Sequence, residues 1–171
     1  MDESEFWSIV ESSKAESDGG FEHRAETLVA RLSALPPEKI IEFQRVFGSL
    51  QDRAYSWDLW GAAYVINGGC SDDGFSDFRS WLISMGRKTY ESALSDPESL
   101  AEITLGDGGE EDASFEVFAY AAAEAYEAST GDELPHPERN FPNEPSGERW
   151  EEGEEELAGR YPKLFAKYGE G

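Results

Sequence analysis

The sequence predicts an all-α fold, a single-domain helical bundle, from three observations. Apolar residues recur at steps of three and four along most of the chain, which is the period of an amphipathic helix. No alternation of apolar and polar residues is long enough to build a sheet. The length of 171 residues, with 39% hydrophobic and 13% aromatic residues, is sufficient for one core. We expect a helical domain over 1–130, and a Pro-rich arm and acidic C-terminal tail over 131–171 that pack on the same domain.

The first 55 residues predict three helices. Their apolar stripes are formed by Phe6, Ile9 and Val10, by Ala25, Leu28, Leu32 and Leu35, and by Ile40, Phe43, Phe47, Leu50 and Ala54. Pro36 and Pro37 separate the second helix from the third, because proline fits the first turn of a helix and not its interior.

Residues 57–67, WDLWGAAYVIN, predict a helix that is apolar on every side. Ser56 can cap its start, and Asn67, Gly68 and Gly69 suit its end. A helix without a polar face belongs inside a fold, and Gly61 allows a neighbour to approach closely. We therefore expect 57–67 to be the central buried helix of the bundle.

Three more helices are expected before the arm. Ser71 can cap a helix with an apolar stripe of Phe75, Phe78, Trp81, Leu82 and Met85. The shorter RKTYESAL follows Gly86, and GDGGEED at 106–112 predicts a polar loop. The segment SFEVFAYAAAEAYEAS at 114–129 then predicts one long amphipathic helix.

The arm, residues 131–150, contains half of the eight prolines and predicts an extended segment. Helical spacing resumes over 151–171 at Leu157, Tyr161, Leu164 and Tyr168, with an interruption at Pro162. We expect Trp150 and Phe165 to pack this helical tail against the body, because leaving its aromatic residues exposed would be costly.

The net charge of −23, from 37 acidic and 14 basic residues, restricts the partners. Such a charge repels nucleic-acid phosphates and anionic membranes, so we expect neither as a partner. An acidic surface either keeps the protein soluble or steers a basic partner toward it. Cys70 is the only cysteine, and the N-terminus MDESEFWSIV is acidic where a signal peptide is basic. These features predict a cytoplasmic protein.

Several reaction chemistries need residue sets that the sequence lacks. His23 and His136 are the only histidines, and neither has a second histidine at metal-ligand spacing. Phosphate-binding loops, dinucleotide fingerprints and EF-hand spacing are also absent. We therefore expect no cofactor, with a divalent metal held by carboxylates as the alternative.

The carboxylates of residues 58–77 include one that helix termini do not explain. Asp58, Asp72 and Asp73 fall in predicted first turns, where the helix dipole favours a negative charge. Asp77 lies four residues after Asp73 on the same face, and like charges at that spacing repel. The pair needs a cation, and a protein arginine is the simplest source. The candidate arginines are Arg45, Arg53 and Arg87. A metal ion or a basic ligand is the alternative source of the positive charge.

The aromatic residues of 57–81 fit either a core or a ligand pocket. Trp57, Trp60, Tyr64 and Trp81 are candidates for aromatic pocket walls, although large aromatics in small helical domains are mostly packing elements. Cys70 as a nucleophile would need a nearby base, and a free buried cysteine is the commoner state.

Two function classes follow. The first is an acidic cytosolic binding or regulatory module that engages a basic protein partner; an antitoxin-like or immunity protein is a special case. The alternative is an enzyme or small-molecule binder at residues 58–81, with Mg²⁺ or Mn²⁺, a phosphate-bearing or cationic ligand, and Arg79 as an anion clamp. Its candidate ligand-binding residues are Trp57, Asp58, Trp60, Tyr64, Asn67, Cys70, Asp72, Asp73, Asp77, Arg79 and Trp81.

The segment RAYSWDLWGAAYVINGGCSDDGFSDFRSWLISMGRKTYESAL resembles DUF4240, a bacterial and mainly actinobacterial domain of unknown function. FWSIVESS near the N-terminus and FEVFAYAAAEAYE are similar too, so the resemblance covers about 3–128. It implies a bacterial, cytosolic, stand-alone domain with 57–86 as its characteristic segment. Because the family has no assigned activity, the resemblance assigns no catalytic residue.

Overall fold

The computed structural model describes residues 1–17, 20–103, 113–136, 142–151 and 153–169. Within these ranges the chain forms α-helices and two short 3₁₀-helices, and no β-strand. A single isolated β-bridge joins Ser56 to Ser146 in the described part of the chain. The predicted all-α fold is confirmed.

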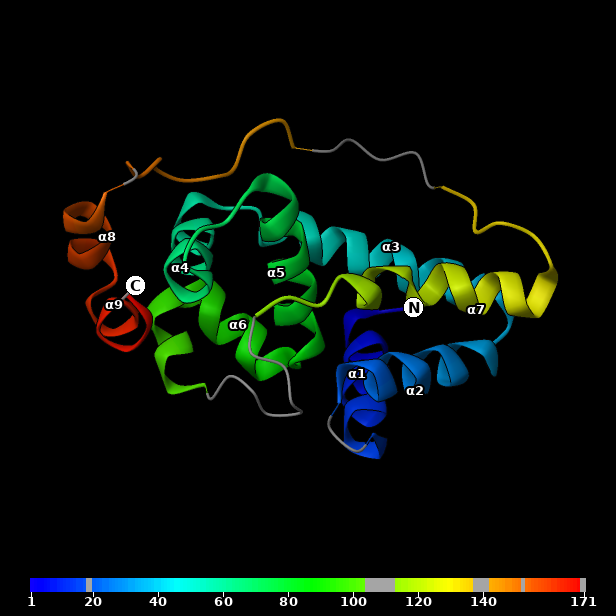
Figure 1. The fold of residues 1–171 in the computed structure, drawn as a ribbon. Coiled ribbons are helices and arrows are strands. Elements are labelled where there is room, and N and C mark those ends of the chain that lie inside the picture. The colour runs from blue at the N-terminus through cyan, green and yellow to red at the C-terminus, as the bar shows by residue number, and fades with distance from the viewer. Residues whose placement is uncertain (18–19, 104–112, 137–141, 152, 170–171) are drawn as a thin grey trace.

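Figure 1 shows the arrangement of the helices. They are α1 (Glu3–Glu16), α2 (Phe21–Ser33), α3 (Pro37–Arg53), α4 (Trp57–Asn67), α5 (Asp72–Ser84), α6 (Arg87–Ser95), η1 (Pro97–Glu102), η2 (Glu116–Tyr120), α7 (Ala121–Thr130), α8 (Glu154–Arg160) and α9 (Pro162–Tyr168). The 3₁₀-helix η1 is an addition to the elements that the sequence predicts. The GDGGEED segment lies outside the described residues.

Local chemistry sets the helix boundaries where the sequence predicts them. Ser56 Oγ accepts a hydrogen bond from the Leu59 N–H at 3.2 Å, and Ser71 Oγ accepts one from the Gly74 N–H at 3.1 Å. Helix α4 ends at Gly68, whose φ of 68° is the left-handed conformation that glycine adopts without strain. Helix boundaries in this region therefore follow from side-chain caps and glycine.

Helix α5, rather than α4, lies at the centre of the bundle. It contacts α1, α3, α4, α6 and η2, and Phe75, Phe78 and Leu82 are fully buried on it. Most of α4 is buried as the sequence predicts, but α5 covers only part of it. Helices η1 and α9 also contact α4. The apolar surface of α4 is therefore buried by α5, by η1 and by the C-terminal tail.

The segment predicted as one long helix over 114–129 is divided in two. Residues Glu116–Tyr120 form the 3₁₀-helix η2, and α7 begins at Ala121. The Phe115 N–H bonds to the Asp77 carbonyl at 3.1 Å, and both Phe115 and Phe118 are buried. A 3₁₀ turn places residues three apart on the same side, so it lets both phenylalanines face the core.

The described parts of the arm are 131–136, which follow α7, and 142–150, which pass α4 on the way to α8 in Figure 1. Beside α4 its backbone is bonded through Ser146, which accepts from the Trp57 N–H at 2.9 Å and donates to the Tyr55 carbonyl at 3.0 Å. Trp150 is buried there, and so are Leu157 and Leu164 of the tail. The predicted break at Pro162 is confirmed, since this residue begins α9.

None of the described helices has both the length and the apolar character that a membrane crossing requires.

Candidate functional site

Three of the predicted ligand-binding residues line a cavity together, which we call the tryptophan pocket. Its walls are Trp57, Trp60, Cys70, Arg149, Trp150 and Glu151, and its volume is about 560 Å³. The Trp57 and Trp60 rings are nearly parallel, 7° apart in plane, with centroids separated by 5.2 Å. Trp150 stands perpendicular to Trp57, at 88° and 6.1 Å between centroids. The pocket is therefore formed by α4, the loop after it and the end of the arm.

Hydrogen bonds to the backbone fix two of these rings. The Trp60 Nε1–H donates to the Cys70 carbonyl at 2.9 Å, and the Trp150 Nε1–H donates to the Trp57 carbonyl at 2.7 Å. The other face of Trp60 stacks on Phe75, at 5.0 Å between centroids. The pocket walls thus continue into the hydrophobic core and have defined positions.

Arg149 and Cys70 provide polar groups in this pocket. The Arg149 guanidinium lies over the Trp57 ring, 5.1 Å from its centroid, and the side chain is exposed. Burial raises the pKa of the Cys70 thiol to about 11, with the nearby Arg79 charge opposing this rise. The thiol is therefore protonated at neutral pH, which does not favour a nucleophilic role.

The remaining predicted aromatic and amide residues lie outside the walls of this pocket. Tyr64 packs on Trp150 at 5.4 Å between centroids, and Trp81 is 3% exposed in the core against Phe78. The Asn67 amide forms two hydrogen bonds with the Ala113 backbone, both at 3.2 Å. These contacts give Tyr64, Trp81 and Asn67 structural roles.

Arg79 is held by the protein itself. Its Nη1 donates to the Gln51 carbonyl at 2.9 Å, and its guanidinium lies 4.7 Å from the centroids of both Tyr55 and Phe75. Burial lowers the pKa of Arg79. The side chain also borders a second cavity of about 870 Å³ beside α3 and residues 133–136, and it is not part of the lining of the tryptophan pocket. The structure does not bring Arg79 and Trp57 to one site.

Asp77 is close to a carboxylate from a distant segment, Glu116, as well as to Asp73 of its own helix. Asp58, Asp72 and Asp73 are exposed in the first turns of α4 and α5. Burial raises the pKa of the half-buried Asp77, and the carboxylates of Glu116 and Asp73 add to this rise. Asp77 is thus repelled by a carboxylate of its own helix and by Glu116 of η2.

The protein arginine expected beside Asp77 is not found in the described ranges. Arg53 pairs with Glu3 at 2.9 Å, and Arg87 pairs with Glu91 at 3.0 Å. No described lysine or arginine forms an ion pair with Asp73 or Asp77. Across the same residues, no group of three or more His, Cys, Asp or Glu side chains is placed to hold a metal ion.

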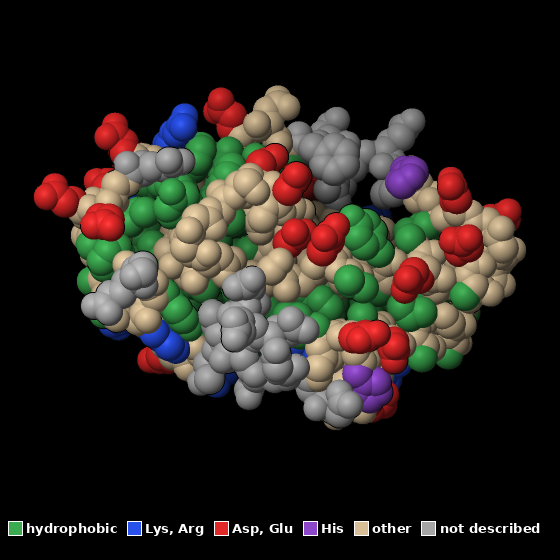
Figure 2. Space-filling model, viewed as in Figure 1, with side chains coloured by type: hydrophobic (Ala, Val, Ile, Leu, Met, Phe, Trp, Pro, Cys, Tyr) green, Lys and Arg blue, Asp and Glu red, His purple; other side chains and the backbone are tan. Residues whose placement is uncertain are grey.

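A groove between α2 and the η2–α7 segment is the second candidate site, and we call it the acidic groove. It has a volume of about 720 Å³. Its apolar lining is Phe21, Ala25, Val29, Ala30, Phe115 and Val117, and its acidic lining is Glu22, Glu26, Glu116 and Glu124. Figure 2 shows hydrophobic side chains gathered where these elements meet, with acidic side chains around them.

A buried arginine supports the floor of the acidic groove. Phe21 and Phe115 stack at 4.4 Å between centroids, 15° from parallel. Arg24, only 5% exposed, lies 5.2 Å and 5.5 Å from these two ring centroids and donates to the Ser84 carbonyl at 2.8 Å. Burial lowers its pKa to about 10, so it remains charged at neutral pH. The floor is therefore connected to the central helix α5.

The four glutamates of the acidic groove are exposed, and so is Val117 at 53%. This site was not predicted from the sequence, because its two sides are about ninety residues apart in the chain. A local signal existed in Glu116 and Glu124, which lie off the apolar stripe of their segment. The sequence also did not indicate that Arg149, Trp150 and Glu151 line a pocket, because they are distant from Trp57 in the chain.

The chain matches one protein family. The model of the family described as protein of unknown function (DUF4240) matches residues 1–128. The chain belongs to DUF4240. No curated protein and no solved structure matches it significantly.

The DUF4240 match contains one candidate site completely and the other only in part. All residues of the acidic groove lie between Phe21 and Glu124, inside the matched range. The tryptophan pocket combines DUF4240 residues of α4 with Arg149, Trp150 and Glu151, which follow the matched range. The acidic groove is therefore a feature of the DUF4240 region alone.

Proposed function

We propose that the protein is a binding module whose acidic groove engages a basic, amphipathic segment of a partner protein. The observation that carries this proposal is an apolar groove floor bordered by four exposed glutamates on a chain of net charge −23. The proposal concerns recognition and assigns no reaction.

The lining of the groove selects the chemistry of the partner. An amphipathic segment buries its apolar face on such a floor. The half-buried Val29 and the exposed Ala30 and Val117 offer apolar surface for it, and the buried Phe21 and Phe115 support them from below. Lysine or arginine side chains flanking that face would meet Glu22, Glu26, Glu116 or Glu124. Each exposed ion pair contributes only about 0–1 kcal/mol, so apolar burial provides affinity while charge provides selectivity and speed of association.

The acidic residues beside the groove favour a cation at one end of it. Asp77 is repelled by both Glu116 and Asp73, and no described basic side chain pairs with either aspartate. A lysine or arginine of the partner near Glu116 would relieve repulsion among these three carboxylates. The whole-chain charge extends the attraction beyond contact distance, to roughly a Debye length of ~8 Å at physiological salt.

A cytoplasmic location is part of the proposal. The sequence has a single cysteine and no disulfide, as expected of a protein from a reducing compartment.

The test uses a labelled synthetic peptide of leucine and lysine with helical spacing. We expect it to bind, and to lose at least about tenfold in affinity between about 50 and 500 mM salt. A scrambled peptide of the same composition should bind more weakly, because its apolar residues no longer share one face. Fluorescence anisotropy measures both affinities.

Two variants with equal charge changes separate the groove from the net charge. The groove variant carries Gln at Glu22, Glu26, Glu116 and Glu124, and the control carries Asn at Asp132 and Gln at Glu144, Glu154 and Glu155, all exposed and outside the groove. We expect the groove variant to weaken peptide binding and the control to change it little. Equal effects of the two variants, or equal binding of the scrambled peptide, would show nonspecific attraction and contradict the proposal.

A further inference from the structure

We propose that the tryptophan pocket binds a small organic cation that carries a quaternary ammonium group. The pocket is separate from the acidic groove, so this inference does not rest on the function proposed above. It uses the face of Trp57 as the cation-binding surface, Trp60 and Trp150 as further walls, and Glu151 as the counter-charge.

The aromatic walls provide the attraction. Aromatic faces carry partial negative charge, and tryptophan attracts cations more strongly than the other aromatic residues do. The faces of Trp60 lie against Trp57 and Phe75, so the face that binds a cation is the one of Trp57 over which Arg149 lies. Trp60 and Trp150 line the same cavity, and Trp150 stands at a right angle to Trp57. The volume of about 560 Å³ lies within the range of small-molecule sites.

Arg149 shows that a cation is attracted to this pocket. Its guanidinium lies 5.1 Å from the Trp57 ring centroid, and no carboxylate of the described residues pairs with it. The ring, rather than a salt bridge, therefore holds the exposed arginine at the pocket. A ligand cation would replace Arg149 over Trp57, and the arginine would return to solvent.

The charges around the pocket favour a cation over an anion. Glu151 lines it and is exposed, so its carboxylate is the charge that remains in the lining once Arg149 has returned to solvent. The indole N–H groups of Trp60 and Trp150 already bond to backbone carbonyls, so they are not available to an anion.

Choline and its neutral isostere, in which carbon replaces the ammonium nitrogen, test the proposal at constant ionic strength. The two probes have nearly the same shape, so their difference measures the contribution of the charge. We expect choline to bind at millimolar concentration, and at least about threefold more tightly than the isostere. Titration calorimetry and tryptophan fluorescence measure the binding.

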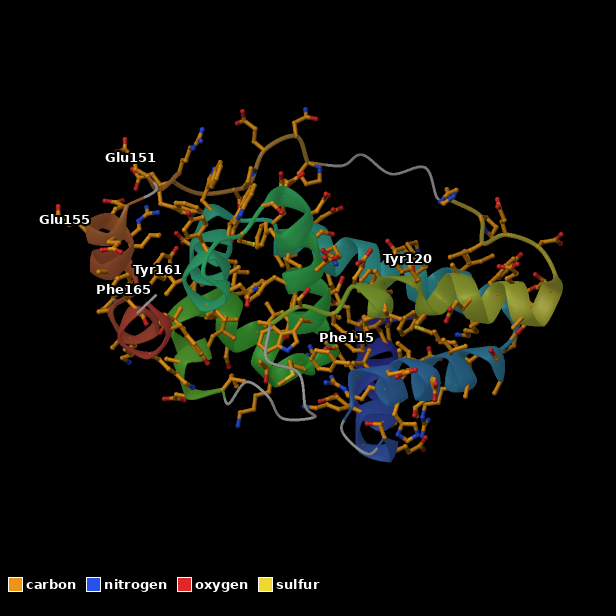
Figure 3. The ribbon with its side chains drawn as sticks, viewed as in Figure 1. Phe115, Tyr120, Glu151, Glu155, Tyr161 and Phe165 are labelled. Atoms are coloured by element: carbon orange, nitrogen blue, oxygen red, sulfur yellow. The ribbon has the colours of Figure 1, made fainter. Side chains whose placement is uncertain are left out.

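Single substitutions test which side chains of the pocket bind the cation. Glu151→Gln should weaken choline binding, whereas Glu155→Gln, a change of equal charge outside the pocket, should leave it unchanged; Figure 3 labels both residues. Arg149→Gln should tighten binding by about twofold or more, because it removes the internal competitor. Trp57→Phe keeps an aromatic ring and should weaken binding, with circular dichroism confirming that the variant is folded.

Several results would overturn the proposal. Equal binding of choline and the isostere would show an apolar cavity without preference for charge. Weaker binding in Arg149→Gln would show that the arginine holds the ligand instead of competing with it. Absence of binding up to about 100 mM choline would show that no site of this strength exists. Should Trp57→Phe fail to fold, the variants of Arg149 and Glu151 still decide the question.

Discussion

Tyr161 of the tail crosses helix α4 directly over Gly61 and donates a hydrogen bond to the Asp58 carbonyl at 2.6 Å. A Cβ atom at position 61 would lie 2.8 Å from Cε2 and Cζ of the tyrosine ring. Figure 3 shows Tyr161 between the tail and the body. The close packing of the tail on α4 therefore depends on a glycine inside the DUF4240 region.

Gly61→Ala is expected to destabilise the protein by about 1–3 kcal/mol, because the added methyl group overlaps a buried ring. This cost exceeds the gain of up to about 1 kcal/mol that alanine brings to a helix interior. Urea unfolding measures the change. Gly159→Ala is the control, since a Cβ at this exposed position in α8 meets nothing within 4 Å. A loss of similar size in Gly159→Ala would contradict the explanation.

Asn67→Ala should cost about 1–3 kcal/mol, because the buried Ala113 backbone loses a partner for both its N–H and its carbonyl. The change should also increase the hydrogen-exchange rate of the Ala113 amide, which NMR measures. The Phe115 amide is an internal reference, since its bond to the Asp77 carbonyl remains. Unchanged exchange at Ala113 would show that the Asn67 contact is dispensable.

Asp77→Asn should stabilise the fold at pH 7 by a few tenths of a kcal/mol. The folded-state pKa of Asp77 is raised by burial and by the Glu116 and Asp73 carboxylates, so the ionised form destabilises the native state. This penalty is present at neutral pH and disappears as the pH falls through the folded-state pKa. The gain from Asp77→Asn should therefore shrink on acidification, which urea unfolding at several pH values measures.

Asp72→Asn is the comparison variant, because it should change the stability of the fold in the opposite direction. Asp72 is exposed in the first turn of α5, where its charge is favoured by the helix dipole. Its replacement should cost about 0.3–1 kcal/mol at pH 7. Stabilisation by both substitutions would indicate general charge repulsion instead of a local effect at Asp77.

Cys70 should react slowly with iodoacetamide at neutral pH. Burial raises its pKa to about 11, so the reactive thiolate is a minor species there. The rate should increase about tenfold for each pH unit up to roughly pH 10, as thiolate formation requires. Mass spectrometry of the alkylated protein over time measures this rate. A plateau below pH 9 would contradict the raised pKa.

Local chemistry along the chain is sufficient to predict the helical fold and most helix boundaries. Apolar periodicity, Ser56 and Ser71 as caps, Pro37 at a helix start and Gly68 at a helix end act through neighbours in the chain, and all are found as predicted. The 3₁₀ turn at η2 was not predictable in this way, because Phe115 and Phe118 adopt it to reach a core built by other segments.

The side chains that meet across the fold could not be predicted from the chain and are seen in the folded molecule. The fold places Arg149 over Trp57, Glu116 beside Asp77, and Phe21 against Phe115. Each of these pairs joins segments that are distant in the chain, so neither spacing nor composition reports the contact. The physical reason is that helix formation follows local propensity and capping, whereas sites form where separately determined helices bury their apolar faces together.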